Sequence, residues 1–325
     1  MFHRTAFACL LGLLVGACSQ ERPKVLKVGI NPWPGYQILT LAQREGCFAA
    51  HGIDAQLVEL ESLHDLVAAF EAGLIDVMPG TFAEALAVVH GGKRKPEVIY
   101  VTDASEGADV VQARAGIASP ADLRGKRIAY EAGALGSYML SRMLELYRID
   151  AAEVECVSMH QVRMEAAMAE GTVDAVITYP PTTEAVAALP GVKTIFSSVE
   201  LPGEILDVLV VDRAHLDADP NFLPSFYAAL ADAQRIAAER PSHARATMAR
   251  ACGLEPSQWA EATKDIRFYR PEHQHDLLWS GQLQRVIDHV DRLLHPQGEQ
   301  SCVDNHELLP AARRPSPLPN LAAPR

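Results

Sequence analysis

The stretch VLKVGINPWPGYQ, residues 25–37, joins a predicted strand to a stiff aromatic turn. The apolar run that ends at Ile30 predicts a buried strand, and two prolines, a tryptophan, a glycine and a tyrosine follow it at once. Pro32 and Pro34 fix φ in the turn, and a helical pattern begins near Tyr36. Strand, turn and helix in this order predict the first unit of an α/β fold with a parallel sheet.

The alternation of strands and helices continues along most of the chain. The strands are predicted at residues 25–30, 56–60, 75–78, 98–102, 110–113, 127–130, 154–159, 173–178 and 206–211. The helices are predicted at residues 36–50, 62–73, 82–90, 134–148, 161–170, 222–239, 243–252, 259–263 and 271–294.

Two segments of the chain repeat the same order of elements. LVAAFEAGLIDV at residues 66–77 aligns with MEAAMAEGTVDA at residues 164–175, and both read as a helix, a glycine cap, two residues, an aspartate and a strand. We therefore expect an α/β protein of two lobes, each with a mostly parallel sheet flanked by helices. Residues 25–105 and 206–295 are predicted to form lobe 1, and residues 106–205 lobe 2. A ligand cleft is expected between the lobes, at the carboxyl ends of the strands.

Both ends of the chain are predicted to lie outside the fold. Residues 1–17 have a positive charge, a short apolar run and small residues before Cys18, which is typical of a lipoprotein signal peptide. Cys18 would then carry the lipid and residues 18–24 would form a tether, whereas a plain secretory signal is the alternative. Residues 296–325 are rich in proline and are predicted to be a partly disordered tail. The sequence thus predicts an exported, periplasmic protein anchored to the membrane by lipid.

Net charge and cysteine spacing argue against some classes of partner and site. The formal net charge is −12, which argues against nucleic acid as a partner. Export places the chain where disulfides form, but the remaining cysteines show no CxxC motif. Disulfides and free buried thiols both stay open for Cys47, Cys156, Cys252 and Cys302.

An ordered series of motifs resembles the nitrate/sulfonate/taurine class of ABC-transporter substrate-binding proteins. The series runs through LKVGINPWPGYQ, GIDAQLVELES, FEAGLIDVMPGTFAEALA, GIASPADLRGKRIAY, GALGSYMLSRMLE and MAEGTVDAVITYPPTTEAV, within residues 25–215. The resemblance implies a two-lobed periplasmic-binding-protein fold of type II. It also implies a solute-binding component that closes on a small molecule and delivers it to an ABC permease and its ATPase, with no enzymatic activity and no cofactor.

Residues from loops at the expected cleft are the candidates for ligand binding. Trp33 and Tyr36 offer rings with polar tips, although packing of the strand on the helix is the alternative role. Ser62 and Thr81 offer hydroxyls, although each is also placed to cap a helix. The full set is Trp33, Gly35, Tyr36, Ser62, Thr81, Asp103, Ser105, Glu131, Leu135, Gly136, Ser137, Tyr179 and Asp207.

The charges of this set predict the chemistry of the ligand. Asp103, Glu131 and Asp207 are acidic, and no arginine or lysine is among the candidates. Carboxylates suit an amine or another N–H donor, such as the aminopyrimidine of the thiamine-precursor branch of this class. Free N–H groups at the helix start near Gly136 would instead suit an anion, and a zwitterion would satisfy both features.

Two other classes of function remain as alternatives. An enzyme is disfavoured because GxSxG, HExxH and Walker motifs are absent, and GALGSY lacks the full dinucleotide-binding pattern. His273 and His275 are more typical of solvated histidines than of metal ligands, so no metal site is expected. A thiamine-pyrimidine-related enzyme of the same superfamily is the closest enzymatic alternative. A ligand-sensing module that presents a small molecule to a separate membrane receptor is the other.

Overall fold

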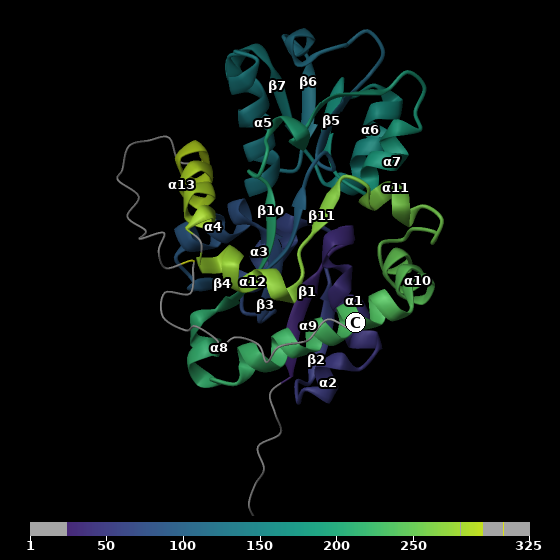
Figure 1. The fold of residues 1–325 in the computed structure, drawn as a ribbon. Helices are drawn as coiled ribbons and strands as arrows, with labels where there is room; N and C mark the ends of the chain where they lie inside the picture. Colours follow the sequence, from purple (N-terminus) through teal and green to yellow (C-terminus); the bar gives the residue numbers. More distant parts are fainter. Residues whose placement is uncertain (1–24, 280, 295–307, 309–325) are drawn as a thin grey trace, which may run out of the picture.

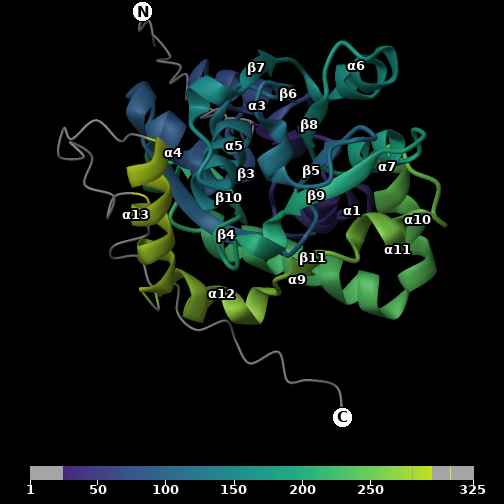
Figure 2. The same cartoon turned by 90° about the horizontal axis from the view of Figure 1, so that it is seen from above.

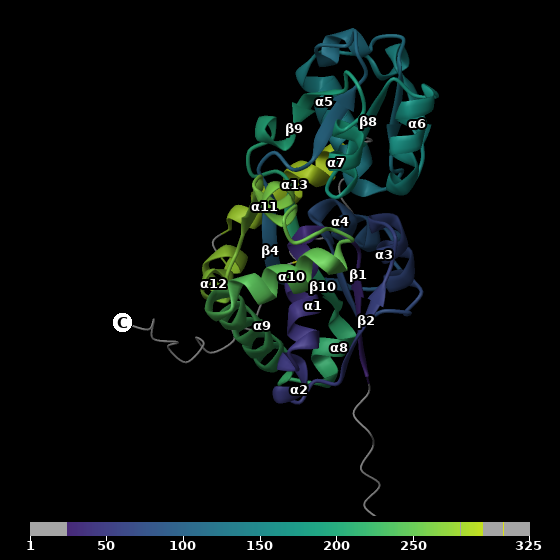
Figure 3. The ribbon, with the colours of Figure 1, turned by 90° about the vertical axis from the view of Figure 1, so that its right-hand side faces the viewer.

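The computed structural model describes residues 25–279, 281–294 and 308. These residues form two sheets that are each covered by helices, and Figure 3 shows the two resulting lobes one above the other. The lower lobe contains a six-stranded sheet in the order β11-β4-β10-β3-β1-β2. The upper lobe contains a five-stranded sheet in the order β7-β6-β8-β5-β9. The predicted signal peptide, Cys18, the tether, Cys302 and nearly all of the predicted tail lie outside the described residues.

The first sheet is parallel on one side and antiparallel on the other. β1 pairs in parallel with β2 and β3, whereas β10 runs antiparallel between β3 and β4. The strands β3 and β4 are buried along their whole length, which fits their apolar sequences. The six strands are β1 (Leu26–Ile30), β2 (Ala55–Glu59), β3 (Val77–Thr81), β4 (Pro96–Ser105), β10 (Leu206–Asp212) and β11 (Ile266–Phe268).

The second sheet has the same mixed character. β6 pairs in parallel with β7 and β8, and β5 runs antiparallel between β8 and β9. The five strands are β5 (Val110–Ala113), β6 (Arg127–Tyr130), β7 (Glu155–Ser158), β8 (Ala175–Thr178) and β9 (Lys193–Ser197). The predicted parallel pairing therefore holds at one side of each sheet. In the first sheet the other side is antiparallel because the chain returns from the second lobe and enters β10 beside the carboxyl end of β3. In the second sheet the antiparallel strand is β5, by which the chain enters from the first lobe.

Helices cover both sheets, and some of them lie between the lobes. The C-terminal helix α13 packs on α4 of the lower lobe and on α5 of the upper lobe. The helices of the lower lobe are η1 (Pro34–Tyr36), α1 (Gln37–Arg44), α2 (Cys47–Ala50), α3 (Leu63–Glu71), α4 (Phe82–Gly91), α8 (Arg213–Ala218), α9 (Phe222–Glu239), α10 (Pro241–Ala251), α11 (Trp259–Thr263), α12 (Pro271–Trp279) and α13 (Gln282–Leu294). Those of the upper lobe and its connection are η2 (Pro120–Leu123), α5 (Ala134–Leu146), η3 (Ala151–Glu153), η4 (Gln161–Arg163), α6 (Met164–Glu170), α7 (Thr182–Ala187) and η5 (Ser198–Glu200).

Some predicted elements have different bounds in the structure. The helix predicted at residues 36–50 is divided into η1, α1 and α2, because Gly46 adopts a left-handed φ of 71°. The helix predicted at residues 271–294 is likewise divided into α12 and α13, with Gly281 at a φ of 73° between them. The strands β9 and β11 and the helices α7 and α8 were not predicted.

The predicted internal repeat has a structural counterpart. Gly73 and Gly171 end α3 and α6 with left-handed φ values of 70° and 72°. The Oδ2 atom of Asp76 accepts a hydrogen bond from the backbone N–H of Lys27 at 2.9 Å, and Asp174 accepts one from Arg127 at 2.9 Å. In both lobes the aspartate thus joins the end of a helix to a parallel strand of its sheet, β1 in the lower lobe and β6 in the upper lobe.

The described cysteines do not form disulfides. Cys47 and Cys252 are buried free thiols, and Cys156 is an exposed free thiol. Burial raises the pKa of the Cys252 thiol to about 12, so this side chain behaves as a packing group. Among the helices of the described chain, none combines the length and the apolar character that a membrane span requires.

Candidate functional site

Two neighbouring pockets lie between the lobes, where the parallel strands of both sheets end. We call the first the acidic pocket. It encloses about 340 Å³ of empty space, part of it open to solvent, and includes Glu84, Asp109, Glu131, Gln161 and Thr178 in its lining. We call the second the aromatic pocket. It encloses about 200 Å³ and is lined by Asn31, Trp33, Tyr36, Leu63, Asp109, Leu135, Tyr179 and Asp207. Leu63, Asp109, Leu135 and Tyr179 line both pockets, so the two form one cleft.

The turn after β1 is held rigidly at the aromatic pocket. The side chain of Asn31 accepts a hydrogen bond from the Trp33 N–H at 3.1 Å, and Gln37 donates to the carbonyl oxygens of Asn31 and Trp33. The indole N–H of Trp33 donates to Asp103 at 3.2 Å, and the Tyr36 hydroxyl donates to Asp207. The prolines and these bonds fix both rings before any ligand enters.

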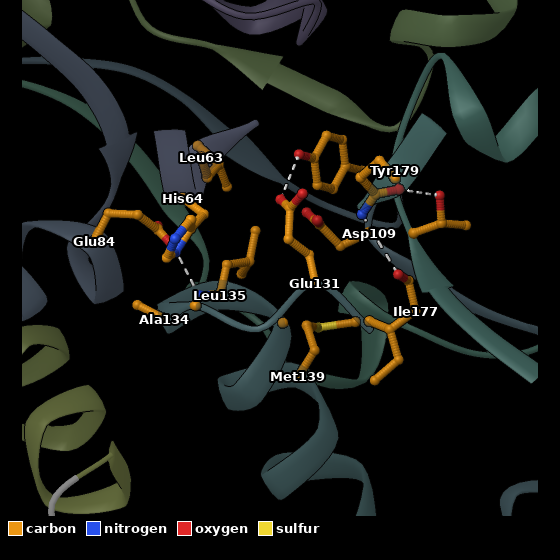
Figure 4. A pocket seen from close by; sticks show the side chains of 14 residues that line it. Leu63, His64, Glu84, Asp109, Glu131, Ala134, Leu135, Met139, Ile177 and Tyr179 are labelled. Atoms are coloured by element: carbon orange, nitrogen blue, oxygen red, sulfur yellow. Dashed lines mark hydrogen bonds between the residues drawn. The ribbon is translucent and has the colours of Figure 1, made fainter. Parts of the chain in front are cut away.

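Aromatic rings from the two lobes meet across the cleft. Trp33 of the lower lobe and Tyr179 of the upper lobe lie edge to face, with ring centroids 5.8 Å apart. The Tyr179 hydroxyl in turn donates to Glu131 at 3.4 Å (Figure 4). The rings therefore form one wall that belongs to both lobes.

The start of α5 forms the opposite side of the acidic pocket. Gly136 is required there, because a Cβ atom at this position would lie 2.2 Å from the carbonyl oxygen of Glu131. The N–H of Leu135 donates to the carboxylate of Glu84 at 2.7 Å. Glu84 comes from α4 in the lower lobe, so this hydrogen bond also joins the two lobes.

Buried carboxyl groups dominate the electrostatics of the cleft. For every one of these carboxyl groups, burial is the largest cause that raises the pKa. It raises the pKa of Asp109 and of Glu131 to about 7. Asp103 and Asp207 face each other across the β4–β10 pairing, so burial is joined by mutual repulsion in raising the pKa of Asp207. The five buried carboxyls are Glu84, Asp103, Asp109, Glu131 and Asp207, and no arginine or lysine is among the described residues that line the pockets.

Among the described residues that line the two pockets, two buried polar side-chain atoms lack a hydrogen-bond partner within the described chain. They are Oε1 of Glu131, which acts as an acceptor, and Nδ2 of Asn31, which acts as a donor. The Nδ1 atom of His160 lies 3.7 Å from Oε1 of Glu131, which is beyond hydrogen-bond distance. An unmade hydrogen bond at a buried polar atom costs free energy, so both atoms favour a ligand that supplies the partner.

The structure brings many of the sequence-predicted residues to the cleft. Seven of them line the pockets: Trp33, Tyr36, Glu131, Leu135, Gly136, Tyr179 and Asp207. Gly35 and Asp103 lie against Trp33, since a Cβ atom on Gly35 would be 2.1 Å from Asp103 and 2.3 Å from the indole nitrogen.

The other four predicted residues are absent from both pocket linings. Ser62 caps α3, and Thr81 caps α4 together with Glu84. Ser105 bonds to Ser198 at 2.8 Å. Ser137 belongs to the first turn of α5 and donates its backbone N–H to Gly133.

Sequence reasoning missed several residues that line the cleft. Glu84 and Asp109 are the chemically important omissions, and Asn31, His64, Gln161 and Thr178 are others. A signal for Glu84 exists in the segment TFAE at residues 81–84, which is a capping box in which glutamate occupies the third helical position. Asp109 lies between β4 and β5, and no local pattern shows which way its side chain faces.

Solved structures with the same arrangement define the class of fold. The aliphatic sulphonate binding protein SsuA from Escherichia coli matches with a TM-score of 0.71 at 17% identity, over 89% of this chain and 92% of that chain. The alkanesulfonate-binding protein SsuA from Xanthomonas axonopodis pv. citri, bound to MOPS, matches with a TM-score of 0.66 at 18% identity, over 82% and 94%. The desulfurization enzyme DszB, in complex with biphenyl-2-sulfinic acid, matches with a TM-score of 0.62 at 18% identity, over 84% and 92%. The fold is therefore that of the periplasmic binding proteins, which enzymes also use.

The sequence also matches a protein family, which is a narrower class than the fold. The NMT1/THI5-like family matches residues 33–244, and the chain belongs to this family. The comparison with curated proteins finds no match. The resemblance and the fold class predicted from the sequence are thereby confirmed.

Proposed function

We propose that the protein is the extracytoplasmic solute-binding component of an ABC importer. It captures one small molecule in the cleft and delivers it to the permease, and a lipid on Cys18 anchors it to the membrane. The ligand has cationic or N–H donor character, as in an aminopyrimidine or an amine. The observation that carries the ligand class is the set of buried carboxyls in a cleft whose described lining offers no arginine or lysine.

The partners within the cleft support this ligand class. Oε1 of Glu131 needs a donor, and an N–H group of a ligand would supply it. Trp33 and Tyr179 offer ring faces and edges beside it, which suit a flat heterocycle or a cation. A cation would also stabilise the ionised forms of Asp109 and Glu131, whose pKa values burial raises to about 7.

Closure of the two lobes is the expected mechanism of capture. Two connections join the sheets, one between β4 and β5 and one between β9 and β10. Rotation about these connections would separate Trp33 from Tyr179 and open the cleft. Closure on a ligand would restore the wall of rings and exclude water, and the closed form would dock on the permease.

The lining of the cleft favours binding over turnover. The described residues that line the pockets include no serine, cysteine or lysine, and burial raises the pKa of the carboxyl groups there, which makes them weaker nucleophiles. At 18% identity the likeness to DszB extends to the fold alone.

A ligand screen tests the proposal directly. The purified protein is mixed in turn with amines, aminopyrimidines, amino acids, nitrate and alkanesulfonates, and its thermal unfolding is followed with each compound. Ligand at about 100 times its dissociation constant adds roughly 2.7 kcal/mol, which gives a clear shift. A shift with amines or pyrimidines supports the proposal, whereas a shift with anions alone contradicts the ligand class.

Glu131→Gln tests the charge at the unpartnered oxygen. The substitution keeps the shape and removes the charge, so the affinity for a cationic ligand should fall by about 1.5–3 kcal/mol. Glu155→Gln, on the exposed strand β7 of the same lobe, is the matched control and should leave the affinity unchanged. Equal affinities for wild type and Glu131→Gln would contradict the proposed contact.

A further inference from the structure

The carboxylate of Glu84 occupies the position where an anionic ligand group would bind. Helix N-termini attract anions because their first N–H groups are unpaired and the helix dipole is positive there. In α5 the N–H of Leu135, the second helical residue, already donates to Oε1 of Glu84 at 2.7 Å. Glu84 is only 2% exposed, so water does not compete strongly for this bond.

The lower lobe holds the Glu84 carboxylate in this orientation. Its Oε2 atom accepts hydrogen bonds from the backbone N–H of Thr81 at 3.0 Å and from the Thr81 hydroxyl at 2.6 Å. The two carboxylate oxygens of Glu84 therefore have different partners. Oε2 caps α4, and Oε1 accepts the hydrogen bond from the first turn of α5. Withdrawal of Glu84 from α5 would leave the Leu135 N–H without its partner at the wall of the acidic pocket.

An incoming anion would meet repulsion as well as competition. Asp109 and Glu131 line the same pocket as Glu84. Burial is the main cause that raises the pKa of Asp109, Glu131 and Asp207, and the nearby charge of Glu84 adds to it in each case. A sulfonate at the start of α5 would therefore add a further negative charge to a pocket whose described lining holds three carboxyl groups and no arginine or lysine.

A second feature of the pocket points to a ligand of the opposite charge. Oε1 of Glu131 is buried in the same pocket and accepts no hydrogen bond within the described chain. At the N-terminus of α5 the Leu135 N–H is thus already paired with Glu84, whereas Oε1 of Glu131 still lacks a hydrogen-bond donor.

We propose that Glu84 determines the charge selectivity of the cleft by acting as a built-in substitute for an anionic ligand group. It excludes sulfonates and related anions from the N-terminus of α5 and leaves the pocket selective for N–H donors. This inference rests on the function proposed above and names the residue that sets its ligand class. Figure 4 shows Glu84 and the first turn of α5 on the same side of the pocket, apart from Glu131 and Tyr179.

Three substitutions at one position test the inference. Glu84→Gln removes the charge but keeps an oxygen that can accept a hydrogen bond, and Glu84→Ala vacates the position. Glu84→Asp keeps the charge and shortens the side chain. Asp122→Asn is the matched control, because Asp122 completes an exposed capping box at Ser119, away from the cleft.

Binding of ethanesulfonate and MOPS is measured by calorimetry for each variant, and circular dichroism confirms that each is folded. We expect weak or no binding by wild type, Glu84→Asp and Asp122→Asn. Glu84→Gln and Glu84→Ala should gain affinity by about tenfold or more, because both remove the negative charge and Glu84→Ala also frees the Leu135 N–H. If Glu84→Ala does not fold, the sulfonate affinities of Glu84→Gln and Glu84→Asp can still be compared. This comparison distinguishes the effect of removing the charge from the effect of changing the side-chain shape.

The outcomes distinguish the inference from the proposed function. Sulfonate binding that stays unchanged in Glu84→Gln overturns the role of Glu84, even if wild type binds amines or pyrimidines. Tight sulfonate binding by wild type overturns both this role and the proposed ligand class. A gain of sulfonate binding in Glu84→Gln supports the role of Glu84, even if no cation in the panel binds wild type and the ligand class fails.

Discussion

The two lobes reach the cleft through loops of different chemistry. In the lower lobe the loop after β1 is built from prolines and aromatic residues, and Trp33 and Tyr36 are buried in it. In the upper lobe the loop after β6 is built from small residues and opens into the first turn of α5, with Gly136 packed on Glu131. The loop after β1 thus contributes rings, and the loop after β6 contributes a helix N-terminus and the carboxyl group of Glu131.

Away from the cleft the lobes are built alike. The N–H of Leu74 donates to Ala69 at 2.9 Å, and the N–H of Thr172 donates to Ala167 at 3.0 Å, so α3 and α6 end in the same way. The aspartates that follow, Asp76 and Asp174, accept hydrogen bonds from the backbone of β1 and β6. The comparison teaches that the joints between helix and strand are repeated, while the loops at the ligand cleft have diverged.

Removal of the ring in the lower loop should have the largest effect. Trp33→Ala deletes a buried side chain that contacts Tyr179 and Asp103, so the free energy of unfolding should fall by about 3–5 kcal/mol. Denaturant unfolding measures this loss, and ligand affinity should fall with it. Trp33→Phe keeps a ring without the N–H donor and should cost less. Equal losses for both would show that the hydrogen bond to Asp103, and not the ring, matters.

The corresponding test in the upper loop uses two glycines of one turn. Gly136→Ala forces a Cβ atom against the Glu131 carbonyl, so α5 must shift, and the expected cost is about 1–3 kcal/mol. Gly133→Ala is the control, because Gly133 has an extended backbone and its nearest contact would be 4.0 Å from the new Cβ atom. A stable Gly136→Ala protein with unchanged ligand affinity would contradict the close packing of α5 on β6.

The acidic cleft predicts an unusual dependence of stability on pH. Burial raises the pKa of Asp109 and Glu131 to about 7, whereas such groups titrate near about 4 in unfolded chains. Between these values the folded protein binds more protons than the unfolded chain, so its stability falls as the pH rises. The melting temperature of the ligand-free protein should decrease by a few degrees between about pH 5 and about pH 7.5.

Two variants give the control for this pH dependence. Asp109→Asn and Glu131→Gln together should reduce the slope of the melting profile in this window, and the remaining slope comes from Glu84, Asp103 and Asp207, whose pKa values burial also raises. The Arg127–Asp174 pair should not contribute there, because the guanidinium lowers the pKa of Asp174 and its effect is lost only in stronger acid. A melting temperature that rises with pH through the window would contradict the buried acidic cluster.

The smallest effect is expected at the shared joints. Gly73→Ala and Gly171→Ala place a side chain on a left-handed residue, which costs about 1–2 kcal/mol in each lobe. Gly171→Ala should cost slightly more, because its Cβ atom would lie 2.3 Å from the flexible Arg114 guanidinium, whereas Gly73 has open space around it. Urea unfolding of both variants measures the difference. A neutral Gly73→Ala beside a damaging Gly171→Ala would show that the joints are not equivalent.

The sequence by itself determined the local units of this protein and their order. Helix caps, glycines with left-handed φ and apolar runs act over a few residues, so α3, α9 and α11 were predicted at or near their observed bounds. The repeat at residues 66–77 and 164–175 predicted the two lobes, and the residues at strand ends predicted much of the cleft wall, including Trp33, Glu131 and Tyr179.

Only the tertiary structure decided which side chains meet across the cleft. Glu84 and Leu135 are 51 residues apart and lie in different lobes, so no local pattern relates them. The antiparallel entry of β10 places Asp207 opposite Asp103, and the direction of β10 depends on the path of the chain back from the upper lobe. Caps and periodicity result from interactions between near neighbours in the chain. The charge of the cleft and the hydrogen bond between Glu84 and the N-terminus of α5 result from how the two lobes pack. Near-neighbour interactions do not specify this packing.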